Sequence, residues 1–244
     1  MTTTVRDMPS HHATDPGPVR IIQILPRLLG GLTLCAVGIA MLIRAELGLG
    51  PWDVLHQGLA VSTGLSVGLA TILVGLAVLV LWFPLRQRPG LGTLANVVWI
   101  GLSLDVLLTV TSPPSALLTR WLLLLTGPVI FAVGVALYIG VGVGTGPRDG
   151  VMTGLAQRGI PIAVARSGLE LSALGLGWVL GGTVGVGTVY FALVVGPIVH
   201  IALPRLRAPW FPPGAHPRVI GGQPRASSTV RTVRNFPESW PRRS

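Results

Sequence analysis

The chain has 244 residues, of which 50% are hydrophobic and only 11% are charged, and its mean hydropathy is +0.70. Soluble domains carry about 25% charged residues, so this composition excludes a soluble fold. All the basic side chains are arginines, and eight of the 18 lie beyond Leu203 in a proline-rich stretch without a recognition fold. That distribution argues against nucleic-acid binding despite the formal charge of +10. The single cysteine, Cys35, excludes an intrachain disulfide and a cysteine-based metal site.

Six apolar stretches have the length, roughly 17–25 residues, that a helix needs to cross a bilayer. They are residues 28–43, 66–83, 93–110, 121–139, 163–180 and 187–203. Two shorter apolar stretches, 52–62 and 148–158, would extend only about 16 Å as helices, so we interpret them as half-helices or interfacial segments. The fold class is therefore an all-α polytopic membrane protein. Eight spans remain the second interpretation, because Arg86 and Arg88 would then lie outside.

Arginine placement predicts that both termini are cytoplasmic, because cytoplasmic loops of membrane proteins are enriched in basic residues. Six spans put most arginines inside: Arg6, Arg20, Arg27, Arg86, Arg88, Arg148, Arg158 and those of the tail. Arg44 and Arg120 then lie outside. Three tryptophans near predicted span ends, Trp82, Trp121 and Trp178, are typical of an aromatic belt.

Two halves of the chain resemble each other at a spacing near 96 residues. Gly48-Leu-Gly-Pro-Trp-Asp53 is repeated as Gly144-Thr-Gly-Pro-Arg-Asp149, and Gly90-Leu-Gly-Thr as Gly185-Val-Gly-Thr. The pattern indicates a duplication in which each repeat holds three spans and one short segment. An odd number of spans inverts the second copy, an arrangement found in many secondary transporters.

The predicted regions follow from this duplication. They are a cytoplasmic N-terminal segment (1–27), a first membrane repeat (28–110), a linker (111–120), a second membrane repeat (121–203) and a disordered basic cytoplasmic tail (204–244). Proline content predicts the disorder of the tail, and its arginines predict attraction to anionic lipids.

The repeated G-x-G-P-x-D sequence predicts the start of a helix. Glycines free the backbone, proline suits the first helical position, and aspartate in the first turn favours the positive end of the helix dipole. One interpretation is a capped interfacial helix. The other is a half-helix whose free N–H groups and carboxylate line a cavity, which makes these residues candidates for a substrate pathway: Gly50, Pro51, Asp53, Gly146, Pro147 and Asp149.

Ionisable residues inside predicted spans are further candidates, because charge at the bilayer centre is costly. Arg166 and Glu170 are four residues apart and would share a helix face, either as a structural ion pair or as part of a coupled transport site. Asp105 and His200 are secondary candidates that an interfacial position would also explain. His56 could titrate near neutral pH, or be merely solvated.

The sequence contains no Walker loop, serine-nucleophile elbow, HExxH motif or paired Cys/His ligands. We therefore expect no enzymatic activity, no cofactor and no metal site.

The repeat residues also carry a family resemblance. Leu47-Gly-Leu-Gly-Pro-Trp-Asp53, Thr63-Gly-Leu-Ser66 and Gly144-Thr-Gly-Pro-Arg-Asp149 resemble the YczE/YitT-type bacterial integral membrane proteins, over roughly residues 28–203. The resemblance implies a bacterial cytoplasmic membrane protein without an established activity.

We interpret the chain as a small-molecule transporter or exporter with inverted repeats. The alternative is a non-transporting scaffold or accessory protein. The expected partners are the lipid bilayer and anionic lipids, and a homodimer would suit so small a transporter.

Overall fold

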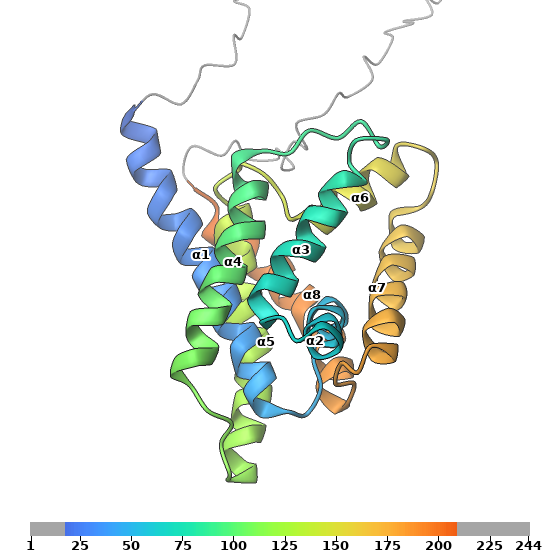
Figure 1. The fold of residues 1–244 in the computed structure, drawn as a ribbon. Helices are drawn as coiled ribbons and strands as arrows, with labels where there is room; N and C mark the ends of the chain where they lie inside the picture. The colour runs from blue at the N-terminus through green and yellow to red at the C-terminus, as the bar shows by residue number, and fades with distance from the viewer. Residues whose placement is uncertain (1–17, 209–244) are drawn as a thin grey trace, which may run out of the picture.

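The computed structural model describes residues 18–208. Across that range the chain folds into eight α-helices without a β-strand (Figure 1), which confirms the all-α prediction. The helices are α1 (Pro18–Ala45), α2 (Pro51–Thr63), α3 (Val67–Val80), α4 (Leu91–Val110), α5 (Leu117–Ile139), α6 (Pro147–Ala156), α7 (Ile162–Val179) and α8 (Val186–Leu206). Most of the predicted N-terminal segment and of the basic tail lies outside the described residues.

Five helices, α1, α4, α5, α7 and α8, are long and apolar enough to cross a membrane. Helices α2 and α3 pass the same test only together, and they are bent by 115° relative to each other. The chain therefore has five candidate spans, or six when the bent pair counts as one. The predicted helix over 66–83 is too long: α3 has 14 residues and ends at Val80, because the chain turns there and the Trp82 side chain packs against α6.

The two short helices begin as the repeated sequence predicts. Gly50 and Gly146 are the N-cap residues, a proline follows at the first helical position, and Asp53 and Asp149 lie in the first turns. Helix α2 ends at Gly64, whose φ of 74° is left-handed, the conformation that glycine adopts at low cost.

Helices α1 and α5 pack against each other through glycines. A Cβ atom on Gly31 would lie 2.9 Å from the carbonyl oxygen of Gly134, and one on Gly38 would lie 2.6 Å from that of Gly127. The contact moves forward along α1 as it moves backward along α5, so the two helices are antiparallel. Small residues let their backbones approach this closely.

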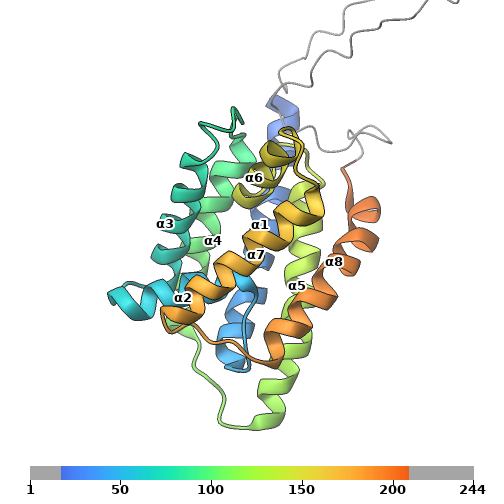
Figure 2. The same cartoon turned by 90° about the vertical axis from the view of Figure 1, so that its right-hand side faces the viewer.

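The remaining contacts lie both between and within the two halves of the chain. Helix α2 packs against α7 and α6 against α3, while α1 packs against α4 and α5 against α8. Two crossing hydrogen bonds join the halves: Gly92 N–H donates to the Val143 carbonyl (3.1 Å) and Gly187 N–H to the Leu47 carbonyl (2.9 Å). Helix α3 also packs along α4, whereas α7 and α8 make almost no contact and diverge in Figure 2.

The start of α1 and the end of α8 lie toward the same end of the bundle (Figures 1 and 2). At the opposite end, the two arginines predicted outside bond to helix C-termini. Arg44 Nε donates to Thr111 Oγ1 just after α4 (3.2 Å), and Arg120 Nε donates to the Ala45 carbonyl at the end of α1 (2.7 Å). Cations are favourable at helix C-termini.

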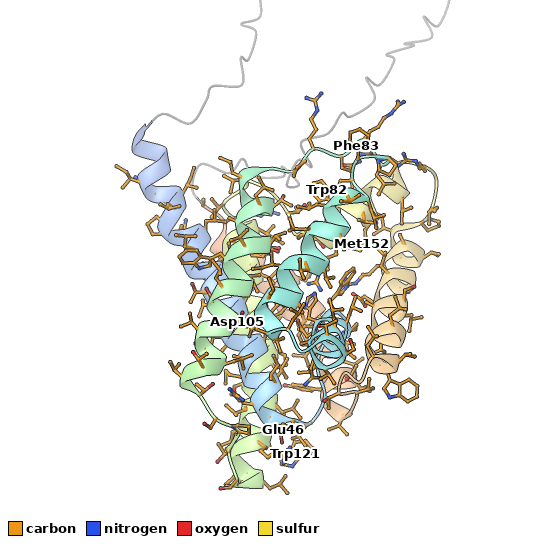
Figure 3. The ribbon with its side chains drawn as sticks, viewed as in Figure 1. Glu46, Trp82, Phe83, Asp105, Trp121 and Met152 are labelled. Carbon is orange, nitrogen blue, oxygen red and sulfur yellow. The ribbon has the colours of Figure 1, made fainter. Side chains whose placement is uncertain are left out.

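The aromatic-belt prediction fails for Trp82. Figure 3 shows Trp82 and Trp121 toward opposite ends of the bundle, but Trp82 is only 2% exposed, against 41% for Trp121 and 69% for Trp178. Trp82 is a packing residue between α3 and α6, whereas the other two have the exposure that a belt requires.

Candidate functional site

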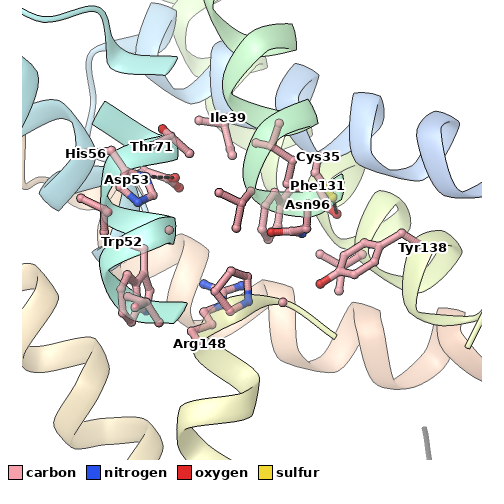
Figure 4. Close-up of a pocket in the computed structure, with 18 residues that line it drawn as sticks. Cys35, Ile39, Trp52, Asp53, His56, Thr71, Asn96, Phe131, Tyr138 and Arg148 are labelled. Atoms are coloured by element: carbon pink, nitrogen blue, oxygen red, sulfur yellow. Dashed lines mark hydrogen bonds and ion pairs between the residues drawn. The ribbon is translucent and has the colours of Figure 1, made fainter. Parts of the chain in front are cut away.

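A cavity of about 100 Å³ lies inside the bundle, where α2 and the start of α6 meet helices α1, α3, α4 and α5. We call it the first cavity (Figure 4). Its apolar wall includes Ile39 and Phe131, and its polar wall includes Asp53, His56 and Arg148. The Arg148 side chain points into the space between Trp52 and Tyr138 (Figure 4).

A second cavity, of about 180 Å³, lies on the other side of Arg148, among α5, α6, α7 and α8. Its polar lining includes Asp149, Arg166 and Glu170. Four residues line both cavities: Trp52, Val135, Tyr138 and Arg148. These four residues form the partition between the two spaces.

Every carboxylate in the two linings has a partner. Asp53 Oδ1 lies 3.6 Å from His56 Nδ1, and Asp149 Oδ2 accepts a hydrogen bond from the Gly146 N–H (3.2 Å). Glu170 pairs with Arg166 at 3.0 Å, as their spacing predicts.

Arg148 differs from these groups. Its guanidinium has no hydrogen bond or ion pair of 4 Å or less within residues 18–208. The charges of Asp149, Asp53 and Glu170 act on it from longer range. The cavities therefore meet at a cation that no group in the described part of the chain binds directly.

The position of Arg148 depends on how α6 begins. Trp82 Nε1 donates a hydrogen bond to the Pro147 carbonyl (2.7 Å), and a Cβ atom on Gly150 would lie 2.0 Å from the Trp82 ring. Only glycine allows the indole to lie this close to the first turn of α6. The bond and the close packing hold that turn against the end of α3.

Most of the predicted pathway residues reach the cavities. The first cavity is lined by Asp53, Gly146 and Pro147, and the second by Asp149, Arg166 and Glu170. Gly50 and Pro51 form the start of α2 without lining either cavity.

The secondary candidates lie elsewhere. Asp105 accepts hydrogen bonds from Ser66 Oγ (2.6 Å) and from the Gly68 N–H (2.7 Å), so it stabilises the start of α3. His200 is exposed on α8. Neither residue lines a cavity.

Sequence reasoning missed the partition. Trp52 and Arg148 occupy the variable position of the repeated G-x-G-P-x-D sequence, and the arginine pattern predicts for Arg148 only a place in a cytoplasmic loop. This variable position in the first turn of a half-helix is the one sequence feature that points to the partition. Cys35 and Tyr138, which also line the first cavity, carry no such signal because each is a single residue in a long apolar stretch. Within 18–208, no three His, Cys, Asp or Glu side chains cluster as a metal site requires.

Comparison with known proteins places the chain among membrane proteins without an assigned activity. Residues 23–204 match a family of unknown function, DUF6198. The chain is 42% identical over 177 residues to an uncharacterized protein of Haemophilus influenzae, covering 72% of this chain and 81% of the relative. It is 34% identical over 179 residues to the uncharacterized membrane protein YczE of Bacillus subtilis, covering 72% and 83%. These matches confirm the resemblance to YczE-type proteins. No solved structure matches the chain.

Proposed function

The chain belongs to the DUF6198 family and is a polytopic membrane protein, and we propose that it transports or exports a small molecule through the two cavities. One observation carries this proposal: residues in the first turns of both short helices line cavities inside the bundle. Broken or short helices that meet within a bundle form the substrate sites of many secondary transporters.

Reciprocal contacts support two inverted repeats. Gly31 and Gly127 are 96 residues apart, as are Gly38 and Gly134, so the contact of Gly31 with Gly134 has its counterpart in that of Gly38 with Gly127. The two crossing hydrogen bonds correspond in the same way, because Gly187 is the counterpart of Gly92 and Val143 is the counterpart of Leu47. Because α1 and α5 are antiparallel, a two-fold axis relating the halves would run across them, as an inverted repeat requires.

The cavity linings support the same relationship. Asp53, Thr71 and Gly75 line the first cavity, and the residues 95 or 96 positions later, Asp149, Arg166 and Glu170, line the second. The two repeats thus place residues from equivalent positions in the linings of the two cavities, and these residues differ in chemistry.

Alternating access explains an asymmetry between the halves. The α3–α4 contact is closed through Gly68 and Gly101, since a Cβ atom on Gly68 would lie 2.1 Å from the Gly101 carbonyl oxygen. Gly196, the counterpart of Gly101 in α8, has nothing within 4 Å of its own Cβ position. Two repeats in different arrangements are expected of a transporter that rocks between states. We propose that the second state closes α7 onto α8 and opens α3 from α4.

We place the protein in the bacterial cytoplasmic membrane with both termini in the cytoplasm. Two features support this orientation. The described ends of the chain lie toward one end of the bundle, and Arg86, Arg88 and Arg158 lie in the connections at that end. Binding of anionic lipid by the tail and homodimer formation remain predictions.

The test is release of solutes from proteoliposomes. Vesicles containing purified protein are loaded with a mixture of carboxylates, amino acids, amines, sugars and nucleosides, and mass spectrometry follows what leaves. Wild-type protein should release one class. Asp149→Asn keeps an oxygen that can accept the Gly146 hydrogen bond, and Glu170→Gln removes the charge that pairs with Arg166. Both should abolish release without loss of reconstituted protein.

His200→Gln, an exposed change outside both cavities, is the matched control and should release solutes at the wild-type rate. Undiminished release by Asp149→Asn and Glu170→Gln would remove both carboxylates from the pathway. If folded wild-type protein releases none of the classes, the transporter proposal fails and the scaffold interpretation takes its place.

A further inference from the structure

Arg148 is the one charged side chain lining the cavities that lacks a direct partner within residues 18–208. Arg148 is half-buried, and taking a guanidinium even partly out of water without a counter-charge in contact is costly. A ligand that offers hydrogen-bond acceptors to the guanidinium lowers this desolvation cost. Because Arg148 lines both cavities, a ligand with a hydrogen-bond acceptor could meet it from either cavity.

We infer that the cavities bind a small organic monocarboxylate with an apolar or aromatic body, its carboxylate on Arg148 and its body beside Trp52. This inference rests on the proposed function, because it takes the cavities as the substrate site. A guanidinium presents a planar fork of N–H donors that matches a carboxylate in two parallel hydrogen bonds. The start of α6, where Arg148 lies, adds the positive end of a helix dipole.

The other charges disfavour a ligand with more than one negative charge. The two linings contain three carboxylates (Asp53, Asp149 and Glu170), two guanidinium groups (Arg148 and Arg166) and one imidazole (His56). A phosphate dianion would add two negative charges to a site already rich in carboxylates. A monocarboxylate adds one, and the unpaired guanidinium is the group that can take it.

The apolar lining defines the rest of the ligand. Trp52, Phe131 and Tyr138 present aromatic surface to the first cavity, with Ile39 and Val97 nearby. Aromatic walls beside the unpaired Arg148 guanidinium favour a ligand that is anionic at one end and apolar at the other.

The experiment is isothermal titration calorimetry of the purified full-length protein in detergent with three probes of similar shape: benzoate, benzylamine and benzyl alcohol. Benzoate should bind in a saturable manner, and the cation and the neutral alcohol should bind at least tenfold more weakly. Equal binding of the three probes, or tighter binding of inorganic phosphate than of benzoate, would overturn the inference.

Two substitutions test the role of Arg148. Arg148→Gln should weaken benzoate binding about tenfold or more, as expected for loss of a charge-assisted bidentate contact. Arg148→Lys should have an intermediate effect, because it retains the charge and loses the fork. Arg205→Gln, which changes an exposed arginine at the end of α8, is the control and should bind like wild type. Unchanged affinity in Arg148→Gln would contradict the inference even if the wild type prefers benzoate.

The probe comparison on wild-type protein does not depend on the variants folding. It also separates this inference from the proposed function. Benzoate binding without release of any solute from proteoliposomes would overturn transport alone. Release of a neutral or cationic solute by a protein that does not bind benzoate would overturn the carboxylate inference alone.

Discussion

Trp52 and Arg148 occupy the same position in the two copies of the G-x-G-P-x-D sequence, 96 residues apart, and each of them lines both cavities. One copy thus presents an indole to the centre of the bundle and the other a guanidinium. A duplication that later diverged at this position would produce such a partition, with an aromatic face and a cation where the two cavities meet.

Opposite membrane orientation of the repeats can be measured with single cysteines. Thr63→Cys and Ile160→Cys, each in a protein whose Cys35 is replaced by serine, place thiols after α2 and after α6 at exposed positions. We expect a membrane-impermeant maleimide to label Thr63→Cys in intact cells and Ile160→Cys in inverted vesicles. Labelling of both from one side would mean parallel repeats and would contradict the inverted arrangement.

Closure of α7 onto α8 can be trapped as a disulfide. Ala163 and Gly196 are the counterparts of Gly68 and Gly101, which are in contact between α3 and α4. In a protein without Cys35, Ala163→Cys and Gly196→Cys should crosslink under mild oxidation and block solute release, and a reducing agent should restore it. A disulfide needs Cα atoms within about 7 Å, so the crosslink reports a state in which the helices meet.

The control pair combines Gly196→Cys with Gly168→Cys. The counterpart of Gly168 is Leu73, which is 43% exposed, so position 168 is expected to face away from α8. This pair should stay reduced. If the two pairs crosslink equally, the crosslink reports random collision, and α7–α8 closure loses its support.

Five of the six predicted spans and the starts of the two short helices could be predicted from sequence because they depend on local rules. Apolar length fixes the spans, and Gly-Pro-x-Asp fixes where α2 and α6 begin. The cavities depend instead on contacts between distant segments. Trp82 illustrates the limit: its position near a span end resembles an interfacial tryptophan, yet its ring packs against Gly150 of the other half. Nothing in the sequence around Trp82 indicates that contact.

Trp82 should act as a positioning residue for Arg148. Trp82→Phe keeps an aromatic ring but removes the Nε1 hydrogen bond to the Pro147 carbonyl, which is worth about 0.5–1.5 kcal/mol of stability. Because the freed turn carries Arg148, we expect benzoate affinity to fall severalfold in calorimetry, beyond the loss in thermal stability.

Trp99→Phe is the matched control, since Trp99 Nε1 also donates one hydrogen bond, to Thr33 Oγ1 (3.0 Å), away from both cavities. It should lower stability without changing benzoate affinity. Equal affinity losses in the two variants would show that Trp82 contributes only to general stability.

The α1–α5 contact should tolerate no side chain at Gly31. A Cβ atom there would lie 2.8 Å from the Tyr138 backbone nitrogen and 2.9 Å from the Gly134 carbonyl oxygen, so neither obstacle is a side chain that can rotate away. Gly31→Val forces the two helices apart, and overpacking of this kind costs about 1–3 kcal/mol. Thermal unfolding followed by size-exclusion chromatography in detergent should show a lower midpoint. Gly30→Val, at the next residue of α1, meets nothing within 4 Å and should unfold at or near the wild-type temperature. Similar losses in the two variants would mean that valine acts through helix propensity, and that the glycine contact does not set the distance between α1 and α5.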